Sequence, residues 1–188
     1  MLDALSNVIT GFGLSASAGL NAYLPLLIVA LIARFTELIR LRAPFDALTS
    51  GWVIGVLALL TLVEVLVDKI PAVDTVNDAL QTIIRPAAGA ILFAASSEVI
   101  TDIHPVLALM CGILVAGTVH AVKASVRPLV TAASAGTANP IVSSVEDGVS
   151  AVISVLSIVI PVAAVGLIVI GLCLILRARR RASGHRVA

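Results

Sequence analysis

Long apolar stretches separated by short polar ones dominate the chain, and they predict a bundle of transmembrane helices. A helix that crosses a bilayer needs about 20 predominantly apolar residues, so the chain has room for about five or six membrane segments. The predicted fold class is all-α, a polytopic transmembrane helix bundle in which some segments are broken or re-entrant. We expect a single transmembrane domain over residues 1–176 and a basic tail over residues 177–188.

The first third of the chain predicts a broken helix, a surface loop and a clear span. The apolar residues 5–33 are too many for one untilted helix, and glycine, asparagine and proline within them predict a break at residues 18–21. Residues 34–46 are polar and basic, which is typical of a loop at a membrane surface. The span Gly51–Val67 begins beside Trp52, and tryptophan is a common anchor at the membrane interface.

The remaining segments are less regular. Residues 74–85 predict an amphipathic helix, and the apolar run 87–95 behind it is short for a full span. Residues 106–126 predict a strong helix. Residues 131–144 are rich in Ala, Ser, Gly and Pro, and we expect a re-entrant or broken segment packed inside protein, since unpaired backbone cannot face lipid. Residues 149–176 predict one long helix with a proline in its middle.

Two helix-break segments resemble each other. Each has the sequence ASAG followed by an asparagine and a proline, and the residues concerned are Gly19, Asn21, Pro25, Gly136, Asn139 and Pro140. Arg-Pro pairs also occur twice, at residues 85–86 and 127–128. Broken apolar segments in two halves are typical of inverted-repeat transporters, whose sites form where helices break. The alternative is that small residues recur by chance in a chain of this composition.

Composition supports a membrane protein and excludes several function classes. Hydrophobic residues make up 60% of the chain and charged residues 12%, about half the charged fraction of a soluble domain. The formal net charge of +1 argues against nucleic acid as a partner. The two cysteines have no nearby ligand-type partners, so we expect no metal site and no cofactor. Motifs of hydrolases, zinc proteases and phosphate-binding loops are absent from the sequence, which argues against an enzyme.

Ionisable residues near the apolar spans are the strongest functional signal. A charge at the centre of a bilayer helix costs roughly 2.5–3.5 kcal/mol on insertion scales, so it must be paired or hydrated. Glu64 and Asp68 share one helix face at a spacing of i, i+4. His120, Lys123 and Arg127 share another. If these helices meet, the acidic residues would neutralise the basic ones and leave His120 near the gap, where a histidine would suit a proton-sensitive element.

A candidate substrate-binding or ion-pair cluster combines these two stripes with the amphipathic helix and an acidic pair behind the broken segment. Its members are Glu64, Asp68, Lys69, Asp74, Asp78, Arg85, His120, Lys123, Arg127, Glu146 and Asp147. The competing interpretation is that charges at the ends of apolar spans are interfacial anchors or solvated faces. The sequence leaves both interpretations open.

Several motifs resemble an uncharacterised bacterial membrane-protein family, catalogued as domain of unknown function number 4126. They are GLNAYLP at residues 19–25, DKIPAVD at 68–74, RPAAG at 85–89, HAVKASVR at 120–127 and Glu146-Asp147. The resemblance covers roughly residues 10–150 and matches least well over 129–144. It implies a compact helical inner-membrane protein and implies no activity.

Two functions compete at this point. The leading hypothesis is a small transporter or permease for an anionic solute or lipid head group, with Arg85, Lys123 and Arg127 contacting the anion. The second is a non-transporting structural or assembly subunit whose ion pairs hold helices in register. Small-residue faces at Gly51/Gly55 and Gly112/Ala116 would serve either a homo-oligomer or internal packing. We expect membrane lipid as a partner and a multi-pass protein of the bacterial cytoplasmic membrane, with the arginine-rich C-terminus in the cytoplasm.

Overall fold

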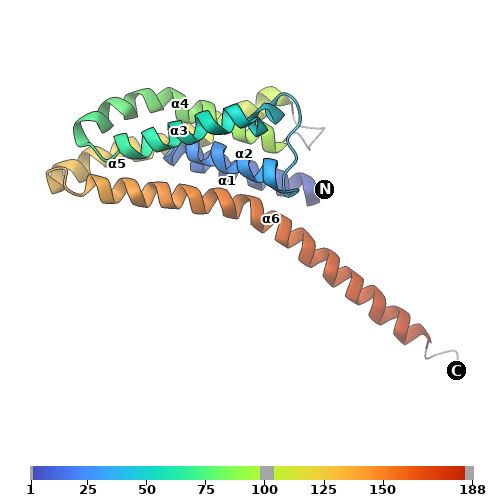
Figure 1. Cartoon of the computed structure of the whole chain (residues 1–188). Coiled ribbons are helices and arrows are strands. Elements are labelled where there is room, and N and C mark those ends of the chain that lie inside the picture. Colours follow the sequence, from blue (N-terminus) through green and yellow to red (C-terminus); the bar gives the residue numbers. More distant parts are fainter. Residues whose placement is uncertain (1, 98–103, 185–188) are drawn as a thin grey trace.

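Helices make up every regular element that the structure describes (Figure 1). The computed structural model describes the backbone of residues 2–97 and 104–184, and the side chains in these ranges except those of residues 2–5, 71–76, 78, 97 and 162–184. The elements are α1 (Leu2–Leu20), α2 (Tyr23–Phe35), the short 3₁₀ helix η1 (Phe45–Thr49), α3 (Gly51–Val67), α4 (Pro71–Ser97), α5 (Pro105–Ser134) and α6 (Asn139–Gly184).

Long apolar helices identify a membrane protein. Among the described residues, three helical stretches are long and apolar enough to cross a bilayer, namely Ala79–Ser96, Pro105–Ser134 and Asn139–Pro161. The helices α2 and α3 are shorter and also apolar. The predicted class, an all-α bundle of membrane helices, is therefore confirmed.

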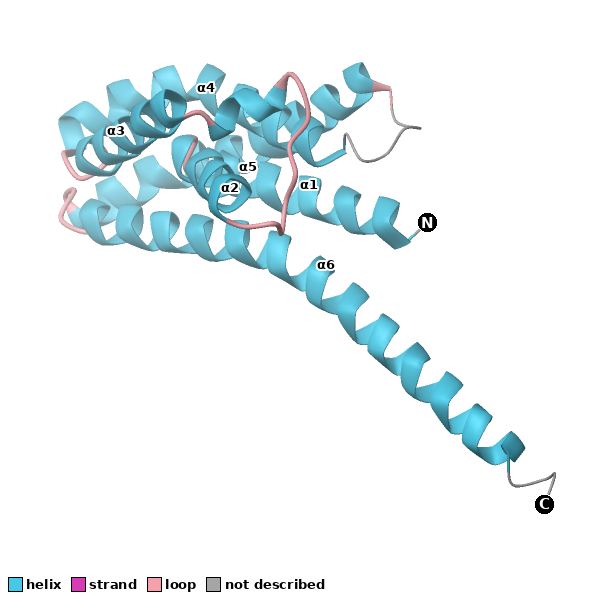
Figure 2. Ribbon diagram, turned by 45° about the vertical axis from the view of Figure 1, so that its right-hand side comes forward, coloured by secondary structure: helices cyan, strands magenta, loops and turns pink. Residues whose placement is uncertain are grey.

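The central helix of the bundle is α1, which packs against α4, α5 and α6 (Figure 2). The helix α3 packs mainly on α2, which makes it the most peripheral of the helices. In Figure 1, α6 runs along the bundle and then continues beyond it toward the C-terminus. Residues 177–184, the first part of the predicted tail, belong to this helix.

Close approach of α4 and α5 depends on glycine. A Cβ atom on Gly112 would collide with the backbone of Gly89 and Ala90, and one on Gly89 would collide with Ala116. The Gly112/Ala116 face is therefore used for packing within the chain. The Gly51/Gly55 face differs, because a Cβ on Gly55 would meet nothing within 4 Å. A homo-oligomer through that face of α3 stays a prediction.

The predicted break in the first apolar stretch is confirmed, because α1 ends at Leu20 and α2 begins at Tyr23. The polar stretch after α2 is a loop, also as predicted. The apolar run 87–95, which we expected to be too short for a full span, is part of one, since α4 runs without interruption through Pro86. Proline removes one helical hydrogen bond and usually kinks or breaks a helix. In α4, packing against both α1 and α5 stabilises the helix on either side of it.

The segment predicted to be re-entrant or broken, residues 131–144, consists of the end of α5, a turn and the start of α6. The helix α5 continues through Pro128 to Ser134, eight residues beyond the predicted end. Ala135 and Gly136 then adopt positive φ angles of 50° and 81°, which reverse the chain, and α6 begins at Asn139. The break was predicted correctly, whereas the re-entrant alternative was wrong. The long helix predicted over 149–176 is also present, as part of a 46-residue α6 with Pro161 inside it.

Candidate functional site

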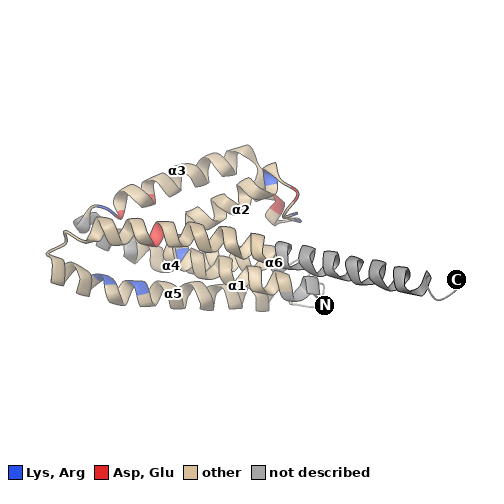
Figure 3. Ribbon diagram, turned by 90° about the horizontal axis from the view of Figure 1, so that it is seen from below, with Lys and Arg blue, Asp and Glu red and all other residues tan. Residues whose placement is uncertain are grey.

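Buried charges from four helices meet in one place, which we call the charged cluster. It consists of Glu64 and Asp68 at the end of α3, Arg85 of α4, His120, Lys123 and Arg127 of α5, and Glu146 and Asp147 of α6. In Figure 3 the charged residues gather toward the end of the bundle away from the chain termini, with a second group at the connection after α2. Six of the eight members are at most 5% exposed, while Glu146 and Asp147 are partly buried.

Asp68 lies at the centre of the cluster. Its Oδ2 atom is 3.6 Å from Lys123 Nζ. The same atom is 3.8 Å from an Nη2 atom of both Arg85 and Arg127. Its Oδ1 atom accepts a hydrogen bond of 2.8 Å from Asn77 Nδ2. Three cations therefore share one buried carboxylate, which makes the cluster a network instead of a set of separate pairs.

Glu64 and His120 both engage Arg85, which is fully buried. Arg85 Nη2 donates to Glu64 Oε1 at 3.2 Å, and Arg85 Nη1 lies 2.9 Å from His120 Nδ1. Because guanidinium nitrogens only donate, His120 Nδ1 must accept in this contact. Its Nε2 atom is then the protonated nitrogen and donates to Thr82 Oγ1 at 3.1 Å. His120 is thus held as a neutral imidazole while it bonds Arg85.

Glu146 bridges the two remaining cations. Its Oε2 atom is 3.0 Å from Lys123 Nζ and 2.8 Å from Arg127 Nη2. The Glu146 side chain is 17% exposed, against 2% for Lys123 and 5% for Arg127. This carboxylate therefore lies at the rim of the cluster, between the two basic side chains and the outside.

At the break between α1 and α2, the end of α1 and the start of α2 both face the charged cluster. Lys123 Nζ donates to the Leu20 carbonyl at the end of α1, at 3.0 Å. Glu64 accepts from the backbone N–H groups of Ala22 at 3.3 Å and Tyr23 at 3.5 Å, where α2 begins. A helix end with free carbonyls favours a cation, and a helix start with free N–H groups favours an anion. Each end of the break is thus matched by a side chain of the favourable sign.

Asn21 connects this break to α6. Its Oδ1 atom accepts from Leu24 N at 2.9 Å, which caps α2. Its Nδ2 atom donates to Asp147 Oδ1, also at 2.9 Å. The first bond fixes the orientation of the amide, so the second must come from the amide nitrogen.

Most outward-facing side chains at the level of the cluster are apolar, and the hydroxyl residues Thr82, Ser125 and Ser144 are exposed among them. On α5, Val122 and Val126 are 60% and 50% exposed, next to the buried Lys123 and Arg127. The other exposed apolar residues nearby are Leu62 and Leu66 of α3, Leu80 and Ile83 of α4, Leu129 of α5, and Ile141, Val145 and Val149 of α6. Interfacial anchors would point toward head groups, whereas these charges point inward behind an apolar surface. The cluster therefore lies inside the bundle at the depth of its apolar exterior.

Lys69 and the residues of the second break, whose side chains the structure describes, do not join the network. Lys69 Nζ donates to the Val65 carbonyl at 3.1 Å and so caps the end of its own helix. The side chains of Asp74 and Asp78 lie outside those that the structure describes. At the second break, Asn139 bonds Thr131 of α5, and Pro140 stands in the first turn of α6. That break therefore satisfies its polar groups locally.

Two predicted break residues have packing roles. A Cβ on Gly19 would come within 2.6 Å of the Ala116 carbonyl oxygen, so glycine lets α1 approach α5. Pro25 is buried in the first turn of α2, a position where the missing N–H of proline costs little.

Several polar residues that bond the charged cluster or lie in the bundle core were not predicted as site residues. Asn77 and Thr82 bond the cluster directly, and Gln81 is 2% exposed beside them on α4. Ser17 of α1 bonds Ser150 and Ser154 of α6, with oxygen–oxygen distances of 2.9 and 2.6 Å. The spacing of Ser143, Ser150, Ser154 and Ser157 along one helical face is the signal that could have identified the serine contact.

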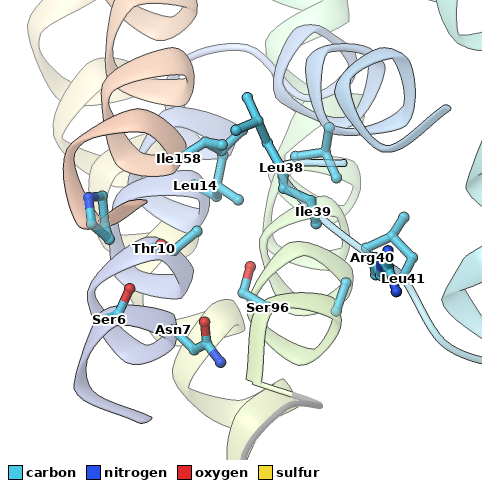
Figure 4. A pocket seen from close by; sticks show the side chains of 13 residues that line it. Ser6, Asn7, Thr10, Leu14, Leu38, Ile39, Arg40, Leu41, Ser96 and Ile158 are labelled. Carbon is cyan, nitrogen blue, oxygen red and sulfur yellow. The ribbon is translucent and has the colours of Figure 1, made fainter. Parts of the chain in front are cut away.

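A separate cavity of about 120 Å³ lies near the N-terminal end of α1 (Figure 4). Its lining includes Ser6, Asn7 and Thr10 of α1, Ser96 of α4 and Arg40 of the loop after α2. It lies at the opposite end of α1 from Leu20 and the charged cluster. In the described part of the chain, no three His, Cys, Asp or Glu side chains are grouped to hold a metal ion.

Comparison with known families identifies a match over most of the chain. A family model described as a domain of unknown function (DUF4126) matches residues 8–181, which is nearly the whole chain. No curated protein and no solved structure matches the chain.

Proposed function

The chain belongs to the DUF4126 family, whose description assigns no activity, and we propose that it is a membrane transporter for an anionic solute or lipid head group. The substrate would bind at the charged cluster, where a broken helix meets charged side chains within the membrane. Transporters commonly place their sites at such breaks, because the free helix ends coordinate ions.

One observation carries the proposal. Lys123 and Arg127 lie side by side and share Glu146, the member of this trio nearest the outside. A carboxylate at the rim of two buried cations occupies the position that an incoming carboxylate or phosphate would need. Oxyanions favour paired amine and guanidinium donors, so such a substrate would replace Glu146 without leaving either cation uncompensated.

The residues behind this pair would hold the site in shape. Asp68 contacts Lys123 and Arg127 from the interior, so both cations remain paired when Glu146 moves away. Arg85 is fully buried between Glu64 and His120. We assign it to the frame of the site, next to the break, instead of to direct contact with substrate.

Arg127→Gln tests the proposal in vesicles that contain the full-length protein. The readouts are uptake of labelled inorganic phosphate, uptake of labelled succinate, and movement of a fluorescent phosphatidylglycerol between leaflets. We expect wild-type protein to move at least one of these probes, and R127Q to lose that flux while keeping its circular dichroism spectrum. The matched control is Arg42→Gln, in the exposed loop after α2. Undiminished flux in R127Q, or no flux of any probe in wild type, would count against the proposal.

The second candidate is a structural or assembly subunit, and the closed ion-pair network favours it. Exchange of charges in R127E/E146R distinguishes the two, because these side chains face each other at 2.8 Å. A structural role predicts that the exchanged pair restores the stability lost in either single variant and keeps any flux that wild type shows. Transport of an anion predicts stable protein without flux, since the donor would then stand on the wrong helix.

The setting proposed for this function follows from charge and composition. We propose a bacterial cytoplasmic membrane protein whose C-terminus, with Arg177, Arg179, Arg180 and Arg181, lies in the cytoplasm. Membrane lipid is its proposed partner, with homo-oligomerisation through α3 as a further proposal, and neither nucleic acid nor a cofactor is involved. We propose no enzymatic activity.

A further inference from the structure

Asp147 is the acidic residue of the charged cluster that forms no ion pair with a described Lys or Arg side chain. Its Oδ1 atom accepts one hydrogen bond, from Asn21 Nδ2 at 2.9 Å. Its Oδ2 atom is buried and has no hydrogen-bond partner among the described residues. No Lys or Arg nitrogen in the described part of the chain lies within ion-pair distance of it.

The other three acids of the cluster are better compensated. Glu64 receives Arg85 and two backbone N–H groups. Asp68 faces three cations and Asn77. Glu146 binds both Lys123 and Arg127. Each therefore has the donors that stabilise a buried carboxylate ion, and Asp147 has one neutral amide.

The charged groups that act on Asp147 from neighbouring elements are already engaged elsewhere. They are Asp68 and Lys69 from the end of α3 and Lys123 from α5. Lys123 bonds Glu146, Asp68 and the Leu20 carbonyl, and Lys69 bonds the Val65 carbonyl. An ionised Asp147 would thus add a negative charge without an ion pair beside Asp68 and Glu146, at a partly buried position.

We infer that Asp147 is a proton-binding site, with the proton carried on Oδ2 while Oδ1 accepts from Asn21. Protonation removes this negative charge and turns the unpartnered oxygen into a hydroxyl. Release returns one proton to water and leaves a carboxylate. Asn21 holds this group against the break between α1 and α2, so the proton lies at the junction of the broken helix and α6.

This inference deepens the proposed function, on which its transport consequence rests. When an anion replaces Glu146 at Lys123 and Arg127, the anion brings additional negative charge into the cluster, and the Glu146 carboxylate, next to Asp147 in the sequence, loses its two cations. A proton on Asp147 lowers the electrostatic cost of that step by removing the other negative charge nearby. The geometry therefore makes the proton the coupling ion, bound together with the anion.

Infrared spectroscopy of the full-length protein in lipid vesicles tests the proton site without any substrate. A protonated carboxylic acid has a carbonyl band that a carboxylate lacks. We expect this band at neutral pH in wild type, its loss or marked weakening in Asp147→Asn, and its retention in Asp46→Asn, a control at an exposed position of η1. In Asn21→Ala the band should remain and shift in position, because Oδ1 loses its donor. A band in D147N as intense as in wild type, or no band in wild type, overturns the inference.

Failure of the transport proposal and failure of the proton site give different experimental results. If no probe anion is moved, the band assigned to Asp147 still decides whether the proton site exists. If flux is found, a proton gradient should accelerate it in wild type and not in D147N. Equal acceleration in both proteins would overturn the coupling role.

Discussion

Replacing Arg85 by methionine tests whether the charged cluster is one energetic unit. Methionine keeps much of the length of the side chain and removes the guanidinium. In the protein, Arg85 is fully buried, donates to Glu64 at 3.2 Å, lies 3.8 Å from Asp68 and bonds His120 at 2.9 Å. Breaking a buried ion pair from one side costs about 3–5 kcal/mol, because the remaining charge stays buried.

We expect R85M to have a lower free energy of unfolding than wild type, with a decrease in the lower half of that range. Asp68 keeps its contacts with Lys123 and Arg127 in this variant, so Glu64 is the carboxylate that loses its cation. Glu64 retains two long backbone donors, at 3.3 and 3.5 Å, which compensate it in part. Glu64→Gln in the R85M background should restore about 1–3 kcal/mol, the usual coupling between contacting residues.

The measurement is unfolding of the detergent-solubilised protein by increasing mole fractions of denaturing detergent, followed by circular dichroism. Arg40→Met is the matched control, because Arg40 pairs with Glu37 at 2.7 Å and both side chains are more than 80% exposed. An exposed pair contributes about 0–1 kcal/mol. The reasoning fails if R85M is no more destabilising than R40M, or if the effects of R85M and E64Q simply add.

Three further predictions concern packing, the helix break and depth in the membrane. Gly112→Val should lower the free energy of unfolding by about 1–3 kcal/mol, because the valine side chain would force α4 away from α5. Gly55→Val should be nearly neutral, since a Cβ there meets nothing within 4 Å. Thermal unfolding of the two variants provides the comparison. Asn21→Ala should cost about 1–2 kcal/mol and accelerate hydrogen exchange of the Leu24 amide; unchanged exchange would exclude the capping role. Trp52 is the only tryptophan and is 88% exposed at the start of α3, so lipids brominated near the head group should quench its fluorescence more than lipids brominated at the chain end.

Local signals in the sequence were sufficient for the helix break and for the two charged stripes. Gly19, Asn21 and Pro25 act over one or two turns, so the break between α1 and α2 can be located without knowledge of the fold. The spacing of His120, Lys123 and Arg127 places them on one side of any helix, and the cost of exposing charge to lipid directs that side inward. The helix break and the inward-facing charged stripe can each be recognised from one segment of the chain alone.

Continuity of α4 was not predictable from local signals. Proline disfavours a helix by about 3 kcal/mol, and this penalty at Pro86 predicts an end. The opposing contribution comes from the contact of Gly89 with Gly112, which are 23 positions apart on different helices. Which acid meets which cation depends equally on how neighbouring helices are rotated and shifted. The sequence therefore predicts the pairing of Asp68 with Lys123, whereas the ion pair between Arg85 and Glu64 was not predicted.

The two breaks show why a shared sequence signature does not define a shared role. At the second break, the Gly136 N–H bonds the Thr131 carbonyl, and the Asn139 side chain bonds Thr131 Oγ1, so the turn satisfies itself. At the first break, the Leu20 carbonyl and the Ala22 N–H instead bond Lys123 and Glu64 from other helices. A break becomes a candidate ion site when the helices that cross it carry charges of the matching sign. A break is therefore informative only together with charged stripes on the neighbouring helices. The break signature by itself also occurs in an ordinary turn, as at the second break.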